Sequence, residues 1–543
     1  MKKHCIRWLC LVLFLSGCSM QTEKEYTSSS TYEQTESVTE KAPIRQDMDP
    51  LVIYICGIQS GILDEEGNIE NNYGSMHMLG TASITGEMDA YKGNAFAQAV
   101  TAYSAETGVP VEIHFTAENI NGEPALEALY QAKTMPDLLL VGKHSMYDYI
   151  QMVKEGLLLD FGPYVSEKTD DSEGYYTSVL RAGHIGGGQY ALPILFNLNG
   201  MITTKEYLRQ IGAAAPAGEA SYEELMQLFT QSCLAMRDNT SLAALAESGG
   251  GFVLGGDYIP SILLGAAIPN YFEKDALTCR VEEALLTDIF ELKIAYDEQE
   301  NAAIVDWRTQ ANFYPGAQGS KTGMLSMVGR DGYETMGIFL TGGRAGGTDV
   351  FSSLLTDLAF FHAMHEDAGQ ETVFCGIPTA AQAGTYSANV TFMALASADT
   401  AYPEEVAELV KYLMDYEFAP WYGFSVNQES TRQQLQNIQT TEVKLLPEAA
   451  WEGLLDAETI EAQTLYIQPL SEALTQQVQN MLDHIAGAAI PYAPLEMGML
   501  WEACDQLRGG QSASAVAEWV TRELEAYQAS PARVPFENIS SLY

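Results

Sequence analysis

A lysine and a histidine that follow an apolar run are the first residues whose position suggests binding chemistry. Residues 138–141 are wholly apolar and are closed by Gly142, which predicts a buried parallel strand rather than a helix. Lys143 and His144 then stand at the carboxyl end of that strand. Ligands of open α/β sheets bind outside the carboxyl ends of the strands. The sequence therefore predicts that Lys143 and His144 face a bound ligand.

The local motifs of common enzymes are absent from the sequence. It contains no H-E-x-x-H, no G-x-S-x-G and no P-loop, and no G-x-G-x-x-G follows a predicted strand. His362 and His365 are three residues apart on a predicted helix, and without a third ligand they are expected to form a surface pair. With 72 acidic residues, a pair of carboxylates can always be proposed as a glycosidase site, so such a pair carries no information. We expect no catalysis, no metal and no cofactor.

The net charge excludes some classes of partner, and the length predicts the number of domains. The chain has 543 residues and a formal net charge of −44, so a nucleic acid or an anionic lipid surface would be repelled. This acidity is typical of the solvated surface of an exported protein. The length predicts two domains, or three.

The N-terminus has the pattern of a signal peptide. Basic residues precede a short apolar core, and residues 15–18, Leu-Ser-Gly-Cys, resemble the lipobox of bacterial lipoproteins. Cys18 would become the lipidated first residue of the mature protein, because the apolar run is too short to span a membrane. Residues 19–50 are rich in Ser, Thr, Glu and Gln and predict a disordered tether.

The remaining cysteines do not indicate a disulfide framework or a zinc site. They are scattered, without a C-x-x-C pair or nearby histidines at metal spacing, which favours buried thiols. These five residues are Cys56, Cys233, Cys279, Cys375 and Cys504.

Helical and strand-like segments surround the predicted strand at 138–141. Residues 146–153 have helical spacing, Gly156 ends that pattern, residues 175–180 form a second helical segment, and residues 189–194 read as a strand. Farther along, Ser221 and Glu224 have the spacing of a capping box. The alternation of strands and helices predicts an α/β fold.

Three short phrases in this region resemble the extracellular solute-binding proteins of ABC importers, in particular the maltose-binding-protein-like family. They are Pro136-Asp137 before the strand, Glu155 to Asp160 with Pro163-Tyr164, and Gly188 to Pro193. The resemblance extends over residues 51 to about 528, with insertions at 58–90 and 334–372. It implies a type II periplasmic-binding-protein-like fold, in which two lobes, each a mostly parallel sheet flanked by helices, are joined by a hinge of several crossings.

The resemblance also implies lobe boundaries and ligand-binding residues. Lobe 1 would comprise residues 51–190 and 376–425, and lobe 2 residues 191–375 and 426–543 with the C-terminal helices. Sugars are held by aromatic rings and by planar polar side chains, and such residues follow the predicted strand ends and crossings. The expected ligand-binding residues are Lys143, His144, Phe196, Asn197, Asp257, Tyr258, Arg330, Asp331, Tyr333, Trp421 and Trp501.

The leading hypothesis is a monomeric, membrane-tethered extracellular receptor. It would close two lobes on a small solute, expected to be a carbohydrate or oligosaccharide, and present it to an ABC permease. One alternative is a lipoprotein with the same two-lobed body that senses a ligand for a membrane kinase. A surface hydrolase is the less favoured alternative.

Overall fold

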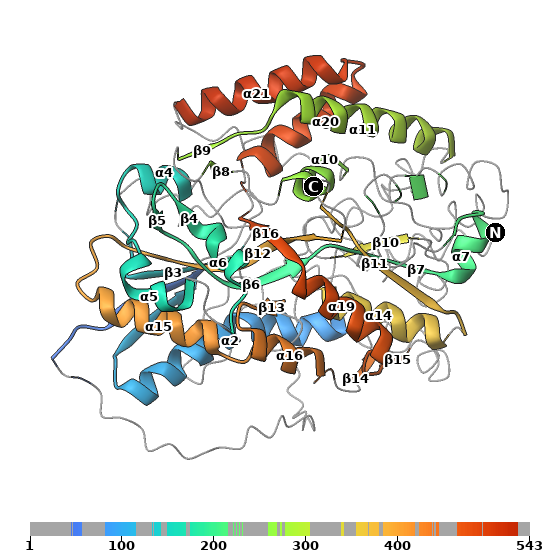
Figure 1. The fold of residues 1–543 in the computed structure, drawn as a ribbon. Coiled ribbons are helices and arrows are strands. Elements are labelled where there is room, and N and C mark those ends of the chain that lie inside the picture. The colour runs from blue at the N-terminus through green and yellow to red at the C-terminus, as the bar shows by residue number, and fades with distance from the viewer. Residues whose placement is uncertain are drawn as a thin grey trace, which may run out of the picture. The chain divides into compact units, whose positions relative to one another are not determined.

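A seven-stranded sheet forms the centre of the described part of the chain. A computed structural model describes residues 45–56, 82–115, 133–142, 149–169, 174–214, 221–231, 259–268, 272–303, 338–341, 354–379, 384–418, 423–444, 464–490 and 492–529, with short gaps inside several ranges. The strand order is β13-β6-β12-β3-β1-β2, and β16 also pairs with β12 (Figure 1). These strands are β1 (Leu51–Cys56), β2 (Val111–Phe115), β3 (Leu138–Gly142), β6 (Leu192–Leu198), β12 (Tyr386–Ala396), β13 (Phe424–Ser425) and β16 (Ile485–Ala489).

The sheet is mixed, because β13 and β16 run in the same direction as the long strand β12, opposite to β1, β2, β3 and β6. β1, β2 and β3 pair in parallel, whereas β12 is antiparallel to both β3 and β6. All residues of β3 are buried, which confirms the strand predicted from the apolar run. All 11 residues of β12 are buried as well, in the middle of the sheet.

A smaller sheet has the order β10-β7-β11, with β10 (Ile338–Thr341) and β11 (Thr372–Gly376) both antiparallel to β7 (Gly200–Thr204). Only Asn199 separates β6 in the large sheet from β7 in the small one. The chain therefore passes between the sheets at Asn199, eight residues after the predicted lobe boundary at residue 191. It returns between β11 and β12. The assignment of the remaining ranges to two lobes stays a prediction.

Two-stranded pairs and helices complete the fold. The pairs are β4 (His184–Ile185) with β5 (Gly188–Gln189), β8 (Phe272–Glu273) with β9 (Thr278–Cys279), and β14 (Thr441–Lys444) with β15 (Thr464–Ile467). The helices are α2 (Ala82–Thr107), α4 (Tyr149–Lys154), α5 (Gly162–Thr169), α6 (Thr177–Leu180), η2 (Arg181–Gly183), α7 (Lys205–Gln210), α10 (Ile259–Ala267), α11 (Glu283–Ala303), α14 (Leu354–Asp367), α15 (Pro403–Asp415), α16 (Gln428–Gln436), α19 (Glu472–Asp483), η5 (Pro494–Met499), α20 (Leu500–Arg508) and α21 (Ala513–Ala529).

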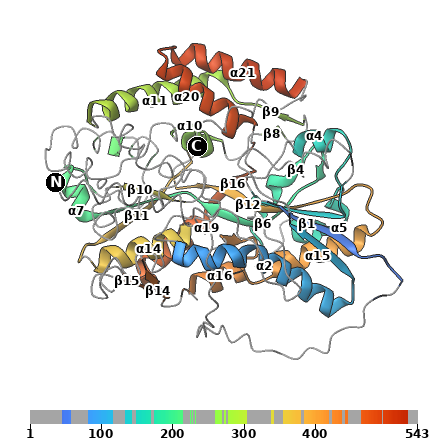
Figure 2. The same cartoon turned by 180° about the vertical axis from the view of Figure 1, so that it is seen from behind.

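Part of each predicted insertion is regular structure. β10 and α14 lie within residues 334–372, and α2 begins inside residues 58–90, whereas residues 58–81 lie outside the described part. Helix α21 packs against both α11 and α20 (Figures 1 and 2). The Gln528 side chain of α21 accepts a hydrogen bond from Cys279 N at 2.6 Å and donates one to Cys279 O at 2.8 Å. These bonds fasten α21 to β9.

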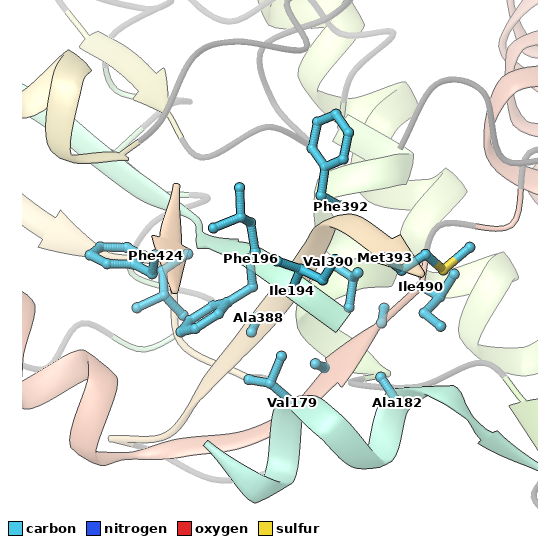
Figure 3. Close-up of a cluster of buried hydrophobic side chains, with 14 of the residues drawn as sticks. Val179, Ala182, Ile194, Phe196, Ala388, Val390, Phe392, Met393, Phe424 and Ile490 are labelled. Atoms are coloured by element: carbon cyan, nitrogen blue, oxygen red, sulfur yellow. The ribbon is translucent and has the colours of Figure 1, made fainter. Parts of the chain in front are cut away.

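Aromatic and aliphatic side chains pack on both sides of β12. Phe392 stacks on Phe96 of α2, with ring centroids 4.6 Å apart. Figure 3 shows Val179 and Ala182, from α6 and η2, on the opposite side of the strand from Phe392. All four residues are at most 5% exposed. The strand is thus held between two apolar layers, each of which stabilises it by burial of nonpolar surface.

The phrases that carried the family resemblance have structural roles here. Asp160 Oδ1 accepts hydrogen bonds from the backbone N–H groups of Gly162 and Gln189, both at 2.8 Å. Phe161 N also donates to Gln189 O at 2.8 Å. Hydrogen bonds therefore join the segment around Asp160 directly to the segment around Gln189.

The Pro136-Asp137 phrase also joins distant segments. Asp137 Oδ2 accepts from Val52 N of β1 at 2.9 Å, and its Oδ1 accepts from the Thr400 hydroxyl at 2.6 Å. This carboxylate therefore connects β1 and β3 to the turn that follows β12.

Replacing Asp160 by Ala should lower stability, because two backbone N–H groups lose a charged acceptor. The expected loss is about 2 kcal/mol in the free energy of unfolding, measured by urea denaturation at pH 7. Asp160→Asn keeps an acceptor and should lose less. Asp399→Ala, at an exposed site, is the control and should change stability by less than about 0.5 kcal/mol. Equal stability of Asp160→Ala and wild type would contradict this role.

Candidate ligand site

The structure describes only some of the residues of the predicted ligand site. Of the eleven predicted ligand-binding residues, the structure describes Phe196, Asn197 and Trp501. The others lie outside the described part of the chain, as does the lipidation residue Cys18. These others are Lys143, His144, Asp257, Tyr258, Arg330, Asp331, Tyr333 and Trp421.

Phe196 is a core residue in this structure. It is 0% exposed and belongs to β6 in the large sheet. Its ring centroid lies 5.3 Å from that of Tyr176. The distance to the ring centroid of Phe424 is 5.6 Å (Figure 3). Its predicted role in ligand binding stays a prediction.

The side chain of Asn197 contacts the start of helix α14. It is 2% exposed, and its Oδ1 accepts a hydrogen bond from Leu354 N at 3.1 Å. Leu354 is the first residue of α14, so this contact satisfies one of the N–H groups that have no partner inside the helix. The predicted role of Asn197 in ligand binding stays a prediction.

Trp501 is the second residue of α20 and is partly exposed. Its predicted stacking role is not tested by this position and stays a prediction.

Uncharged polar side chains gather where the chain passes between the two sheets. Asn199 Oδ1 accepts from Asn389 Nδ2 at 3.0 Å, and Asn199 O accepts from Ile377 N at 3.0 Å. Asn199 thus connects the outgoing passage to the returning one, which ends in β12. Asn199 and Asn389 are 4% and 1% exposed. The hydrogen bond between the two side chains offsets part of the cost of burying them.

This cluster lies beyond the carboxyl end of β3. Gly142, the last residue of β3, pairs with Phe392, so residues 386–391 of β12 extend past it. Strands β3 and β6 are parallel, because both are antiparallel to β12, and β6 ends beside the same part of β12. This is the edge at which an α/β sheet binds its ligands.

The sequence contained a signal for this cluster that the motif search missed. Residues 387–391 read Ser-Ala-Asn-Val-Thr, in which polar and apolar residues alternate inside a strand that is otherwise apolar. None of these residues was among the predicted ligand-binding residues, because the search used recognised motifs and predicted strand ends.

A buried glutamine anchors the segment next to Trp421. Gln434 is 4% exposed, and its Nε2 donates to Phe418 O at 2.8 Å and to Gly423 O at 3.1 Å. Its Oε1 accepts from Ser425 N at 3.2 Å. One side chain therefore holds both residues that flank positions 419–422.

Of the two histidines of α14, which were predicted at the surface, His365 is buried and His362 is partly exposed. His365 is 2% exposed, and its Nδ1 lies 3.1 Å from the Thr372 hydroxyl. His362 Nδ1 lies 3.3 Å from the same hydroxyl. Burial, with a smaller contribution from His362, lowers the pKa of His365 to about 4. His365 is therefore neutral at pH 7 and packs α14 against β11.

Searches for a metal site and for a membrane span found neither among the described residues. No cluster of three or more His, Cys, Asp or Glu side chains there could hold a metal ion. Within the same ranges no helix has the length and apolarity needed to cross a membrane. Cys279, Cys375 and Cys504 are free and buried, which confirms the prediction for these three thiols.

Comparison with known proteins shows the fold. No family model matches the sequence, and no curated protein is significantly similar to it. A periplasmic oligogalacturonide-binding protein from Yersinia enterocolitica has a similar structure, with a TM-score of 0.52 and 12% identity over 81% of this chain and 97% of its own. A sugar transporter protein from Rhizobium etli, in an open conformation, gives 0.51 and 12% over 88% and 99%.

These similarities confirm the predicted fold class, the two-lobed α/β fold of type II periplasmic binding proteins. They also confirm, for the fold, the resemblance to extracellular solute-binding proteins of ABC importers. A de novo designed cysteine esterase has the same fold, with a TM-score of 0.51 and 11% identity over 89% of this chain and 99% of its own. The fold by itself therefore does not separate binding from catalysis.

Replacing Gln434 by Met should loosen the segment that Gln434 anchors. Met has a similar length but cannot bind the two carbonyls, so hydrogen exchange of the amides in peptides covering residues 418–425 should be about tenfold faster. Gln528→Met is the matched control, because Gln528 also binds backbone groups but far along the chain, at Cys279. That variant should leave exchange in 418–425 unchanged. Unchanged exchange in Gln434→Met would show that Gln434 is not the anchor.

His365 should make stability fall between pH 7 and pH 5. Its pKa is about 4 in the folded protein and about 6.5 when unfolded, so the unfolded state binds the proton more tightly in this window. The resulting loss is about 2 kcal/mol at pH 5. His365→Gln should remove that part of the pH dependence, whereas exposed His484→Gln should keep it. Identical pH profiles for wild type and His365→Gln would contradict the assignment.

Proposed function

We propose that this chain is an extracellular solute-binding protein that captures a carbohydrate for an ABC transporter. The observation that carries the proposal is the pair of passages between the two sheets, with a buried and uncharged polar cluster beside them. Two lobes joined in this way can close on a solute by a hinge motion. Proteins of the same fold include the oligogalacturonide-binding protein and the sugar transporter protein described above.

The charge of the chain favours a neutral sugar over an acidic one. The formal net charge is −44, so a uronate would approach against a repulsive potential, which salt screens. The polar residues at the passages, Asn197, Asn199 and Asn389, are amides and carry no charge. A neutral carbohydrate suits both features, because its hydroxyls exchange hydrogen bonds with amides and need no counter-charge.

Attachment to the membrane is part of the same proposal. We infer that Cys18 carries lipid and that residues 19–50 let the folded part move above the membrane surface. As a flexible coil, this tether would span roughly 30 Å on average. The partner would be a permease, to which a single copy of the chain presents the sugar.

A thermal-shift screen tests the ligand class. The panel contains neutral monosaccharides and oligosaccharides, the matching uronates, and short peptides. A neutral sugar should raise the unfolding temperature, since a ligand at a hundred times its Kd adds about 2.7 kcal/mol. Uronates should stabilise less, and their effect should grow with salt. Stabilisation by peptides alone would rule out the carbohydrate assignment.

A further inference from the structure

Two buried hydroxyl groups on β12 have no hydrogen-bond partner in the described chain. Ser387 and Thr391 are 4% and 3% exposed. Neither Ser387 Oγ nor Thr391 Oγ1 makes a hydrogen bond within the residues that the structure covers. An unsatisfied buried hydroxyl destabilises the folded state. Two of them on one strand leave hydrogen bonds that a group outside the described residues can complete.

The two hydroxyls flank the amide pair at the passages. Ser387 and Asn389 share one face of β12, because alternate residues of a strand point to the same side. Ala388 and Val390 belong to the apolar cluster of Figure 3. Asn389 is held by its bond to Asn199, so the polar face has a fixed position. It lies beyond the carboxyl end of β3, where the sheet is expected to meet its ligand.

Thr391 is placed by a β-bulge and by a glycine. The pairing of β12 with β6 shifts register between Val390 and Phe392, which makes Thr391 the bulged residue. Bulges near functional sites redirect a side chain. A Cβ on Gly423 would lie 2.7 Å from Phe196 O and 3.4 Å from Thr391 Oγ1. The glycine therefore allows the close backbone approach and also leaves space beside the Thr391 hydroxyl.

The chemistry of the cluster selects an uncharged partner with hydroxyl groups. A serine or threonine hydroxyl can donate one hydrogen bond and accept two. The buried polar residues at this place, Asn197, Asn199, Ser387, Asn389 and Thr391, have no formal charge to balance that of an ionic ligand. A sugar hydroxyl, which also donates and accepts, matches such a surface.

We propose that Ser387 and Thr391 bind hydroxyl groups of a neutral sugar and form a subsite at the passages between the two sheets. This subsite deepens the proposed function and rests on it. The sugar displaces any water that the two hydroxyls hold, and Asn389, kept in place by Asn199, lies between them in the sequence. Ser387 and Thr391 are ligand contacts on this proposal, whereas Asn199 is a positioning residue.

The test uses the Ser387→Ala and Thr391→Val variants and their combination. Without sugar, the double variant should unfold at the same temperature as wild type or higher, because it removes two unsatisfied buried hydroxyls. Affinity for neutral sugars should fall about tenfold in the double variant, since two hydrogen bonds are lost. The probes are glucose, galactose, and their trisaccharides, titrated by calorimetry. Higher stability combined with weaker binding is a signature that a purely structural role would not give.

Thr431→Val is the matched control. Thr431 is 0% exposed, and its hydroxyl donates to Ser425 O at 2.7 Å, so this variant loses a bond that the protein does make. It should unfold at a lower temperature and bind sugar as wild type does.

Three outcomes would overturn the subsite. A lower unfolding temperature of the sugar-free double variant would mean that trapped water or protein already satisfies the hydroxyls. Unchanged affinity in that variant, with wild type binding one of the probes, would overturn the subsite alone. Failure of wild type to bind any of the neutral probes would overturn the subsite together with the neutral-sugar part of the proposed function.

Discussion

The fold depends on one constraint, the antiparallel insertion of β12 between β3 and β6. Because β12 runs opposite to β6, it begins at the edge of the sheet where β6 ends, and a short hairpin could have joined the two strands. The chain instead leaves at Asn199 and returns after β11, and the smaller sheet is built from the residues between these points. Because all 11 residues of β12 are buried, the strand also supplies the centre of the core. The same strand therefore completes the core of the first sheet and ends the segment that builds the second.

Among the described residues, the buried polar side chains at the passages carry no charge, whereas Lys293, His365 and Glu496 are buried on other elements. Lys293 is fully buried on α11 and pairs with Asp297, and His365 is buried on α14 against Thr372. At the passages themselves, Asn199 and Asn389 supply hydrogen bonds without charge. A chain with a formal net charge of −44 thus combines an acidic composition with a neutral interior at the place where a ligand is expected. Such an interior avoids the large desolvation cost of buried charge and suits a ligand that has none.

Elements with a clear local pattern of apolar residues could be predicted from the sequence. The sheet to which a strand belongs could not, because it depends on residues far away in the chain. The run at 138–141 was found because its burial follows directly from the apolar pattern. β6 and β7 are both wholly buried and only Asn199 separates them, so periodicity does not show where the chain changes sheets. The spacing of His362 and His365 places them on the same side of α14. The sequence did not show which side of the helix is exposed, because α14 also carries buried Leu354, Leu358 and Phe361. The phrases at Asp137 and Asp160 were informative because they fix the backbone, and for that reason they say nothing about the ligand.

Ligand contacts close to the hinge and contacts far from it would affect lobe closure differently. Asn199 bonds both to Ile377 in the returning passage and to Asn389 in β12, so on the proposed function a closing motion would turn about this residue. Groups near the axis of a rotation move least. Ser387 and Thr391, close to Asn389 in β12, would hold a sugar in the same way before and after closure. On the predicted site, Lys143 and His144, which follow β3 in the sequence, would gain contacts only as the lobes approach. Contacts that exist in both states raise affinity without favouring closure, whereas those that form only on closing shift the population toward the closed state. The subsite at the passages would thus bind the sugar, and the loops at the strand ends would convert binding into closure.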